Sequence, residues 1–207
     1  MTFIYQVLKE QLDNRHLIFR LAAYELKSKY QMHYLGMLWQ FLNPVLQISV
    51  FWFVFGIGIR EGAPVGDTPF FVWLVLGLVP WFYISATVTQ ASNSVFSKVN
   101  LVSKMKFPVS VLPSITIVGN AVSFIVMLFF IGLILIVNQI NSGIYLLQLP
   151  YYLVSLFVFI FAISIFNSTL ATIVRDYQIL LQSMVRMLFF LNSNFFGFHQ
   201  DCLNNFR

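Results

Sequence analysis

The sequence predicts an all-α membrane protein, a polytopic helical bundle of about five transmembrane spans with an N-terminal interfacial helix. Of the 207 residues, 59% are hydrophobic and only 9% are charged, whereas soluble domains carry about 25% charged residues. Uncharged apolar runs of about 20 residues recur along the chain, and this length crosses roughly 30 Å of hydrocarbon. The net charge of +5 is therefore interpreted by position in the membrane, and not as a sign of nucleic-acid binding.

Five apolar runs define the expected spans. The first four cover residues 38–59, 69–91, 109–137 and 151–173, and a fifth covers residues 179–198 and includes Arg186. A polar NQINSG stretch at residues 138–143 separates the third run from the fourth. We expect one transmembrane domain over residues 1–207, with a cytoplasmic or interfacial segment 1–37, a transmembrane region 38–198 and an atypical tail 199–207.

The positions of the basic residues predict the orientation. Five precede the first span, namely Lys9, Arg15, Arg20, Lys27 and Lys29, and the second connection adds Lys98, Lys104 and Lys106. The first connection holds only Arg60, the third none, and the fourth Arg175. Because short cytoplasmic loops carry the excess of Lys and Arg, we expect a multi-pass protein of the cell membrane. Its N-terminus, segment 98–106 and the Arg175-Asp176 pair would face the cytoplasm.

The N-terminal segment has the spacing of an amphipathic helix. Leu17, Ile18 and Leu21 follow one another at helical intervals, continued by Tyr24 or Glu25. Such a helix lies along the membrane surface with its apolar side in the headgroup boundary. The alternative is a basic leader that only sets the topology.

The distribution of ionisable residues argues against an enzyme and against an ion-coupled carrier. All seven acidic residues lie in connections or terminal segments, and no GxxxxGK[ST] loop occurs, so we expect no catalytic residue and no nucleotide site. The three histidines lie far apart and Cys202 is the single cysteine, so no metal and no cofactor is expected. The first four spans lack the ionisable residues that couple carriers to protons or sodium.

The connection between the second and third spans is the candidate for contact with a partner. It reads SKVNLVSKMKFP at residues 97–108. In a helix, Val99 and Val102 share one side, and Leu101 and Met105 share another. Pro108 ends such a helix sharply. A short, stiff element held between two spans suits docking into a partner's groove. The alternative is that the lysines only set topology and that Phe107-Pro108 is a plain turn.

Four stretches of the chain resemble a known family. They are residues 25–56 (ELKSKYQMHYLGMLWQFLNPVLQISVFWFVFG), 77–85 (GLVPWFYIS), 100–113 (NLVSKMKFPVSVLP) and 175–182 (RDYQILLQ). Together they resemble the ABC-2 type permeases that export bacterial polysaccharides, and within that family most of all the wall teichoic acid translocation permeases.

The resemblance implies partners and a site of force transmission. It implies a homodimeric permease that works with two copies of a separate ATP-binding subunit and moves a lipid-linked anionic polymer across the lipid bilayer. The ATPase would act on the coupling segment, which comprises Lys98, Val99, Leu101, Val102, Lys104, Met105, Lys106, Phe107 and Pro108. Nucleic acid is not an expected partner.

Further residues are candidates for the substrate path and for a helix cap. Arg186 lies ten residues after Asp176, about 15 Å along a helix, where an arginine costs about 2.5–3.5 kcal/mol. It would contact phosphates of the polymer, or else reach back to the interface or pair with Asn167.

Trp81 and Tyr83 follow Pro80 and would line a path, although such residues more often mark membrane interfaces. Asp176 would cap the fifth helix, and a force-transmitting role for Arg175-Asp176 is implied by the resemblance alone.

The end of the chain differs from the family. After Leu191 it reads NSNFFGFHQDCLNNFR where the relatives continue with a sixth span, so a truncated or frame-shifted product is expected. The predicted function is the permease subunit of an ATP-driven exporter of a cell-surface polymer, a teichoic acid or a polysaccharide. The alternative is a non-transporting permease that acts as a membrane scaffold or binds the ATPase. The sequence does not identify the polymer.

Overall fold

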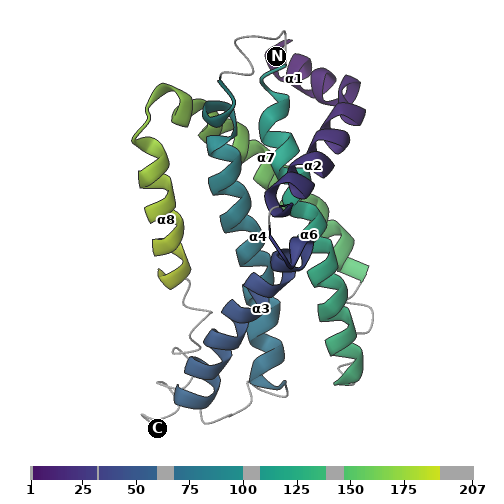
Figure 1. Cartoon of the computed structure of the whole chain (residues 1–207), viewed down its shortest axis with the longest axis vertical. Coiled ribbons are helices and arrows are strands. Elements are labelled where there is room, and N and C mark those ends of the chain that lie inside the picture. Colours follow the sequence, from purple (N-terminus) through teal and green to yellow (C-terminus); the bar gives the residue numbers. More distant parts are fainter. Residues whose placement is uncertain (1, 32, 60–67, 100–107, 139–146, 192–207) are drawn as a thin grey trace.

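A computed structural model describes residues 2–31, 33–59, 68–99, 108–138 and 147–191, and the elements in these ranges are helices (Figure 1). They are α1 (Thr2–Asp13), α2 (Arg15–Tyr30), the 3-10 helix η1 (Gly36–Leu38), α3 (Trp39–Phe51), the π-helix η2 (Trp52–Ile59), α4 (Phe70–Ser97), α6 (Val111–Val137), α7 (Leu149–Ile173) and α8 (Tyr177–Leu191). The predicted all-α bundle is confirmed.

Four of the predicted spans are present. Continuous helical segments long and apolar enough to cross a membrane cover Gly36–Gly58, Phe70–Ser97, Val111–Val137 and Leu149–Ile173. The fifth run begins as α8, whose 15 described residues extend about 22 Å. Its remaining residues, 192–198, lie outside the described ranges, so a fifth crossing stays a prediction.

Helix α4 is the centre of the bundle. It packs against α6 and α7 and also contacts α3, η2 and α8. Its inward side chains include Leu74, Leu78 and Ala91, which are 1%, 0% and 0% exposed. Lipid tails are as apolar as leucine, so close packing of this kind, and not exclusion of water, holds membrane helices together.

The N-terminal helix α2 lies along the first half of α6. Ile18 and Ala22 are buried together with Val111, Leu112 and Ile115 of α6. Leu21 is half-buried against this cluster, while Tyr24 is exposed. The helical spacing predicted for α2 is present, but much of its apolar side contacts protein and is not left free for the headgroup boundary.

The turn between α2 and α3 depends on a glycine. Gly36 has a φ of +50°, in the left-handed region that other residues rarely adopt. This conformation lets the chain enter η1 and then the first span.

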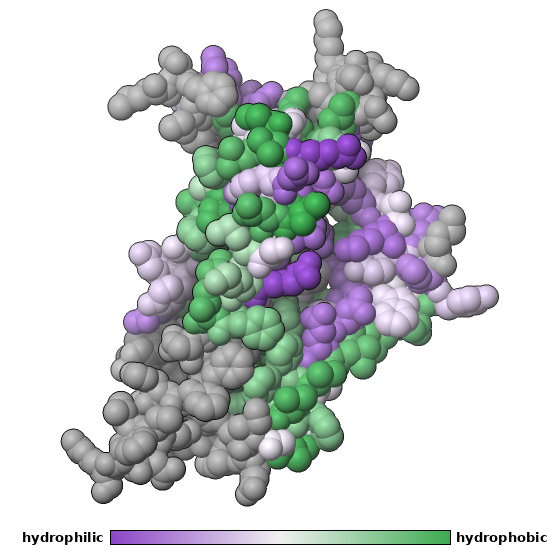
Figure 2. All heavy atoms as spheres, turned by 90° about the vertical axis from the view of Figure 1, so that its left-hand side faces the viewer, coloured by the Kyte–Doolittle hydropathy of each residue, from purple (hydrophilic) through white to green (hydrophobic). Residues whose placement is uncertain are grey.

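Most outward-facing side chains of the spans are apolar. On the face shown in Figure 2, hydrophobic residues cover most of the lower described part, and hydrophilic residues gather at the middle and upper levels. Phe53, Ile136 and Val158 are among the apolar residues more than 60% exposed. This surface suits a hydrocarbon environment.

Candidate functional site: a polar cavity between four helices

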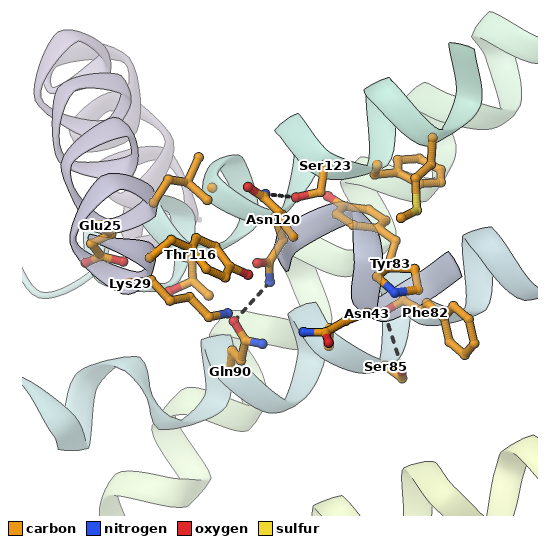
Figure 3. Close-up of a pocket in the computed structure, with 18 of the residues that line it drawn as sticks. Glu25, Lys29, Asn43, Phe82, Tyr83, Ser85, Gln90, Thr116, Asn120 and Ser123 are labelled. Atoms are coloured by element: carbon orange, nitrogen blue, oxygen red, sulfur yellow. Dashed lines mark hydrogen bonds between the residues drawn. The ribbon is translucent and has the colours of Figure 1, made fainter. Parts of the chain in front are cut away.

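A cavity of about 710 Å³ lies between α2, α3, α4 and α6 (Figure 3). Its volume is in the range of small-molecule binding sites. Its uncharged polar lining residues are Ser28, Tyr30, Gln40, Asn43, Gln47, Tyr83, Ser85, Gln90, Thr116, Asn120 and Ser123. So many amides and hydroxyls inside a bundle of apolar spans need a specific explanation.

The amides of α3 form one stripe. Gln40, Asn43 and Gln47 stand at positions i, i+3 and i+7 and all line the cavity, as expected for one face of a helix. The Gln40 amide donates a hydrogen bond to the Ser123 hydroxyl of α6. This bond joins the first span to the third at one wall of the cavity.

Helices α4 and α6 contribute the opposite walls. The Asn120 amide of α6 donates hydrogen bonds to the Thr87 hydroxyl (3.3 Å) and to the Gln90 side-chain oxygen (3.4 Å) of α4. Tyr83 and Phe124 stack with ring centroids 4.4 Å apart and planes 7° apart. The Tyr83 hydroxyl is buried and has no hydrogen-bond partner of normal geometry among the described residues.

Charged residues occupy the end of the cavity nearest the coupling segment. The Lys98 ammonium forms an ion pair with the Glu25 carboxylate of α2, and burial lowers the pKa of Lys98. The Lys29 ammonium lies 5.6 Å from the centroid of the Tyr30 ring, and burial raises the pKa of the Tyr30 hydroxyl. Figure 3 shows the Lys29 side chain extending from α2 toward Gln90.

Replacing Glu25 with Gln should weaken the attachment of α2 to the end of α4. Lys98 would then remain partly buried without its carboxylate partner, which costs more than an exposed charge. Because the Glu25 side chain is 40% exposed, we expect a loss of about 1 kcal/mol or less. A double-mutant cycle with Lys98→Met, followed by melting temperature in detergent, measures the coupling. Additive effects of the two substitutions would show that the pair contributes nothing.

Only the ends of the coupling segment lie in the described ranges. Lys98, Val99 and Pro108 are described, whereas Leu101, Val102, Lys104, Met105, Lys106 and Phe107 lie outside the described ranges, so the predicted helix there stays a prediction.

Both flanks of the coupling segment contact the N-terminal helices. Lys98 pairs with Glu25, and just after Pro108 the Ser110 hydroxyl donates to the Glu10 carboxylate. The Gln11 amide also donates to the Ser110 carbonyl at 2.8 Å.

The Arg175-Asp176 pair lies at the start of α8. The Arg175 guanidinium is 5.1 Å from the centroid of the Phe96 ring near the end of α4. Asp176 immediately precedes α8, and its backbone carbonyl accepts from the Ile179 and Leu180 amides. The capping role of its side chain stays a prediction. Gln178 fixes α8 to α4 by accepting from the Ser92 hydroxyl (2.5 Å) and donating to the Thr89 carbonyl (2.9 Å).

The three residues predicted for a substrate path do not lie together. Tyr83 lines the cavity, whereas Trp81 contacts Phe189 of α8 at 5.8 Å between centroids. Arg186 is exposed on α8 and outside the cavity lining. Asn167, considered as its partner, accepts a hydrogen bond from the Tyr177 hydroxyl at 2.7 Å.

Sequence reasoning missed the amide stripe of α3. Its signal was the helical spacing of Gln40, Asn43 and Gln47 within the first span, which carries no formal charge. A search for ionisable groups passes over neutral amides.

Among the described residues, no group of three or more His, Cys, Asp or Glu side chains could hold a metal.

Comparison with known proteins finds O-antigen export permeases among the proteins similar to this chain. The chain is 33% identical over 123 residues to the O-antigen export system permease protein RfbA of Myxococcus xanthus, a match that covers 59% of this chain and 46% of the relative. It is 26% identical over 167 residues to a protein of the same name from Klebsiella pneumoniae, covering 80% of this chain and 63% of the relative. A second Klebsiella pneumoniae protein of that name matches to the same extent.

The chain is similar to O-antigen export permeases over part of its length. The matches span about half to five-eighths of the length of these relatives. No family model matches the chain. The relatives' names agree with the polysaccharide-exporter resemblance, and they do not mention teichoic acid.

Proposed function

We propose that this chain is the permease subunit of an ATP-driven exporter that moves a lipid-linked cell-surface polymer across the cytoplasmic membrane. The observation that carries the proposal is the similarity to O-antigen export permeases over 80% of the chain. The fold supports it, because three of the four membrane-spanning helices, together with α2, enclose a polar cavity that a purely structural bundle would not need.

The energy source in this proposal is a separate ATP-binding subunit. The sequence has no nucleotide-binding loop, and the first four spans lack the ionisable groups of ion-coupled carriers. Segment 98–108 would receive the force, with the lysines keeping it on the cytoplasmic side. Its flanks contact α1 and α2, so a push on the segment would reach the N-terminal helices as well as α4 and α6. Two permeases and two ATPase subunits would form the transporter.

The relatives' names favour a polysaccharide as the polymer. A teichoic acid, suggested by the sequence resemblance, is the second substrate to test. Both are polyhydroxylated chains on a lipid carrier, so neutral amides and hydroxyls suit either of them.

Complementation tests the proposed function. The chain is expressed as sole copy in cells depleted of their own O-antigen export permease, with the matching ATP-binding subunit present, and surface polysaccharide is quantified. A second strain, depleted of its teichoic acid permease, is tested by surface phosphate. We expect delivery above the empty-vector level in one strain. Polymer retained inside in both strains, with the protein present in the membrane, would contradict export. Co-purification of the ATP-binding subunit in that case would favour a scaffold.

Arg186 is proposed to contact phosphates of the polymer, because it is an exposed cation on a helix of apolar neighbours. Replacing Arg186 with Leu should lower polymer delivery several-fold at an unchanged protein level. Replacing it with Lys keeps the charge and should preserve most of the delivery. Equal delivery by wild type and Arg186→Leu would rule out the contact.

A further inference from the structure

We propose that the cavity between α2, α3, α4 and α6 is a binding site, within a single chain, for a sugar that carries a phosphate. Asn43 and Gln47 would contact the sugar hydroxyls and Lys29 the phosphate. This inference rests on the proposed function, which supplies such a group as the first part of a lipid-linked polymer. It goes further by placing the group inside one protomer and by naming the side chains that hold it.

Two amides of the first span lack partners. Asn43 and Gln47 are exposed, stand one helical turn apart and line the cavity, and neither side chain makes a hydrogen bond within the described part of the chain. Their neighbour Gln40, by contrast, is bonded to Ser123. An amide left without a hydrogen bond in an apolar medium costs about 2–7 kcal/mol. Asn43 and Gln47 therefore bond to whatever polar molecule occupies the cavity, which is water when no ligand is bound, and both amides are free to bond to a polar ligand.

The lining selects the class of that occupant. Its polar groups are mostly neutral amides and hydroxyls, which both donate and accept hydrogen bonds, as sugar hydroxyls do. The rings of Tyr83 and Phe124 stack on each other and are 4% and 3% exposed, so they form a closed apolar wall of the cavity. A cationic ligand would need a free carboxylate, and the carboxylate in the lining, Glu25, is already paired with Lys98.

A cation is available at one end of the cavity. Lys29 is exposed and lines the cavity, and no carboxylate pairs with it within the described ranges. Figure 3 shows it reaching toward Gln90, while Asn43 extends from α3 into the same space. A phosphate bound by the Lys29 ammonium would leave the attached sugar within the amide-lined part. An ammonium is a suitable point charge for phosphate.

Binding to the purified chain in detergent tests the site. Three probes separate the sources of the ligand: farnesyl diphospho-N-acetylglucosamine, which carries lipid and sugar, N-acetylglucosamine 1-phosphate, which lacks the lipid, and farnesyl diphosphate, which lacks the sugar. We expect the first to bind about tenfold or more tightly than the third, as two additional hydrogen bonds allow. Tight binding of the soluble sugar phosphate would assign the same site to a soluble ligand.

Variants locate the binding. Asn43→Leu combined with Gln47→Leu should abolish the preference for the sugar-bearing probe, and Lys29→Met should weaken all phosphate probes alike. Ser49→Leu is the matched control, because Ser49 lies on the same helix, outside the cavity lining, and its hydroxyl bonds to the Val45 carbonyl of its own helix. Removing two unpaired amides should leave the melting temperature unchanged or higher, which separates loss of a ligand site from misfolding.

Photo-crosslinking gives a second measurement should the double variant fail to fold. A benzoylphenylalanine replacing Gln47 should be labelled by the sugar-bearing probe, and one replacing Ser49 should not. Equal affinity for probes with and without sugar, or equal labelling at both positions, would overturn the inference. If complementation fails but the purified chain still prefers the sugar-bearing probe, export is rejected and the binding site is retained. If delivery is restored but the purified chain shows no preference for the sugar-bearing probe, the binding site is rejected and export is retained.

Discussion

Replacing Leu78 with Ala should destabilise the bundle by roughly 2–5 kcal/mol, the range for removing a buried leucine side chain from a packed core. Leu78 is 0% exposed and belongs to the main cluster of buried residues, which α4 shares with α6 and α7. The smaller side chain leaves a cavity whose lining loses van der Waals contacts. Because lipid provides little hydrophobic driving force between membrane helices, those contacts are not replaced. A melting temperature lower by about 5–15 °C in detergent is expected.

Leu76 provides the matched control for this substitution. It lies two residues away on α4 and is 43% exposed, so Leu76→Ala removes the same atoms from a surface that faces lipid or detergent. We expect a change within about 2 °C. Equal losses at Leu76 and Leu78 would show that α4 is not the packing centre of the bundle.

The spans could be predicted because their signal is local. Twenty uncharged apolar residues must be helical in hydrocarbon, since every backbone group needs an internal partner. The runs at 38–59, 69–91, 109–137 and 151–173 therefore correspond to α3 with η2, α4, α6 and α7 within a few residues at most ends. The largest difference is at the end of α4, which continues to Ser97. Ser92 and Ser94 are buried there and not placed in a loop, and Ser92 is bonded to Gln178 of α8.

The arrangement of the helices could not be predicted in the same way. The spacing of Leu17, Ile18 and Leu21 identifies an amphipathic helix, but headgroups and another helix offer equally suitable apolar surroundings. Whether this helix packs against another helix depends on Val111, Leu112 and Ile115, which lie some ninety residues later in the chain. Likewise, Gln40 and Ser123 meet only after folding. Hydropathy predicts the length of a span. Contacts between residues that are far apart in the sequence determine which helix faces enclose a cavity.

The same limit explains the outcome for the candidate residues. Tyr83 lines the cavity because the side of α4 that bears it packs against Phe124, and Trp81, two residues earlier, points toward Phe189 of α8. Residues two apart on a helix do not share a face. A proline followed by aromatic residues therefore could not indicate which ring faces the cavity.

Replacing Ile18 with Asp should detach α2 from the bundle and reduce polymer delivery to about a tenth or less. Ile18 is 6% exposed and packs against Val111, Leu112 and Ile115. A carboxylate there would lack a cationic partner, and an isolated buried charge costs several kcal/mol. Once α2 leaves α6, the contacts made by Glu25 with Lys98 and by Glu10 with Ser110 lose their support. Both flanks of the coupling segment would then be free of the N-terminal helices.

His16→Asp is the matched control, because it introduces the same group on the same helix at an exposed position. Surface polymer and membrane protein level are measured together in the complementation strain. A loss of delivery in Ile18→Asp alone, with the four spans still folded and the ATP-binding subunit still co-purifying, would show that α2 carries force after the motor has docked. Loss of the co-purifying subunit would instead place α2 in the docking surface itself. Normal delivery by Ile18→Asp would mean that the segment acts on α4 and α6 directly, without the N-terminal helices.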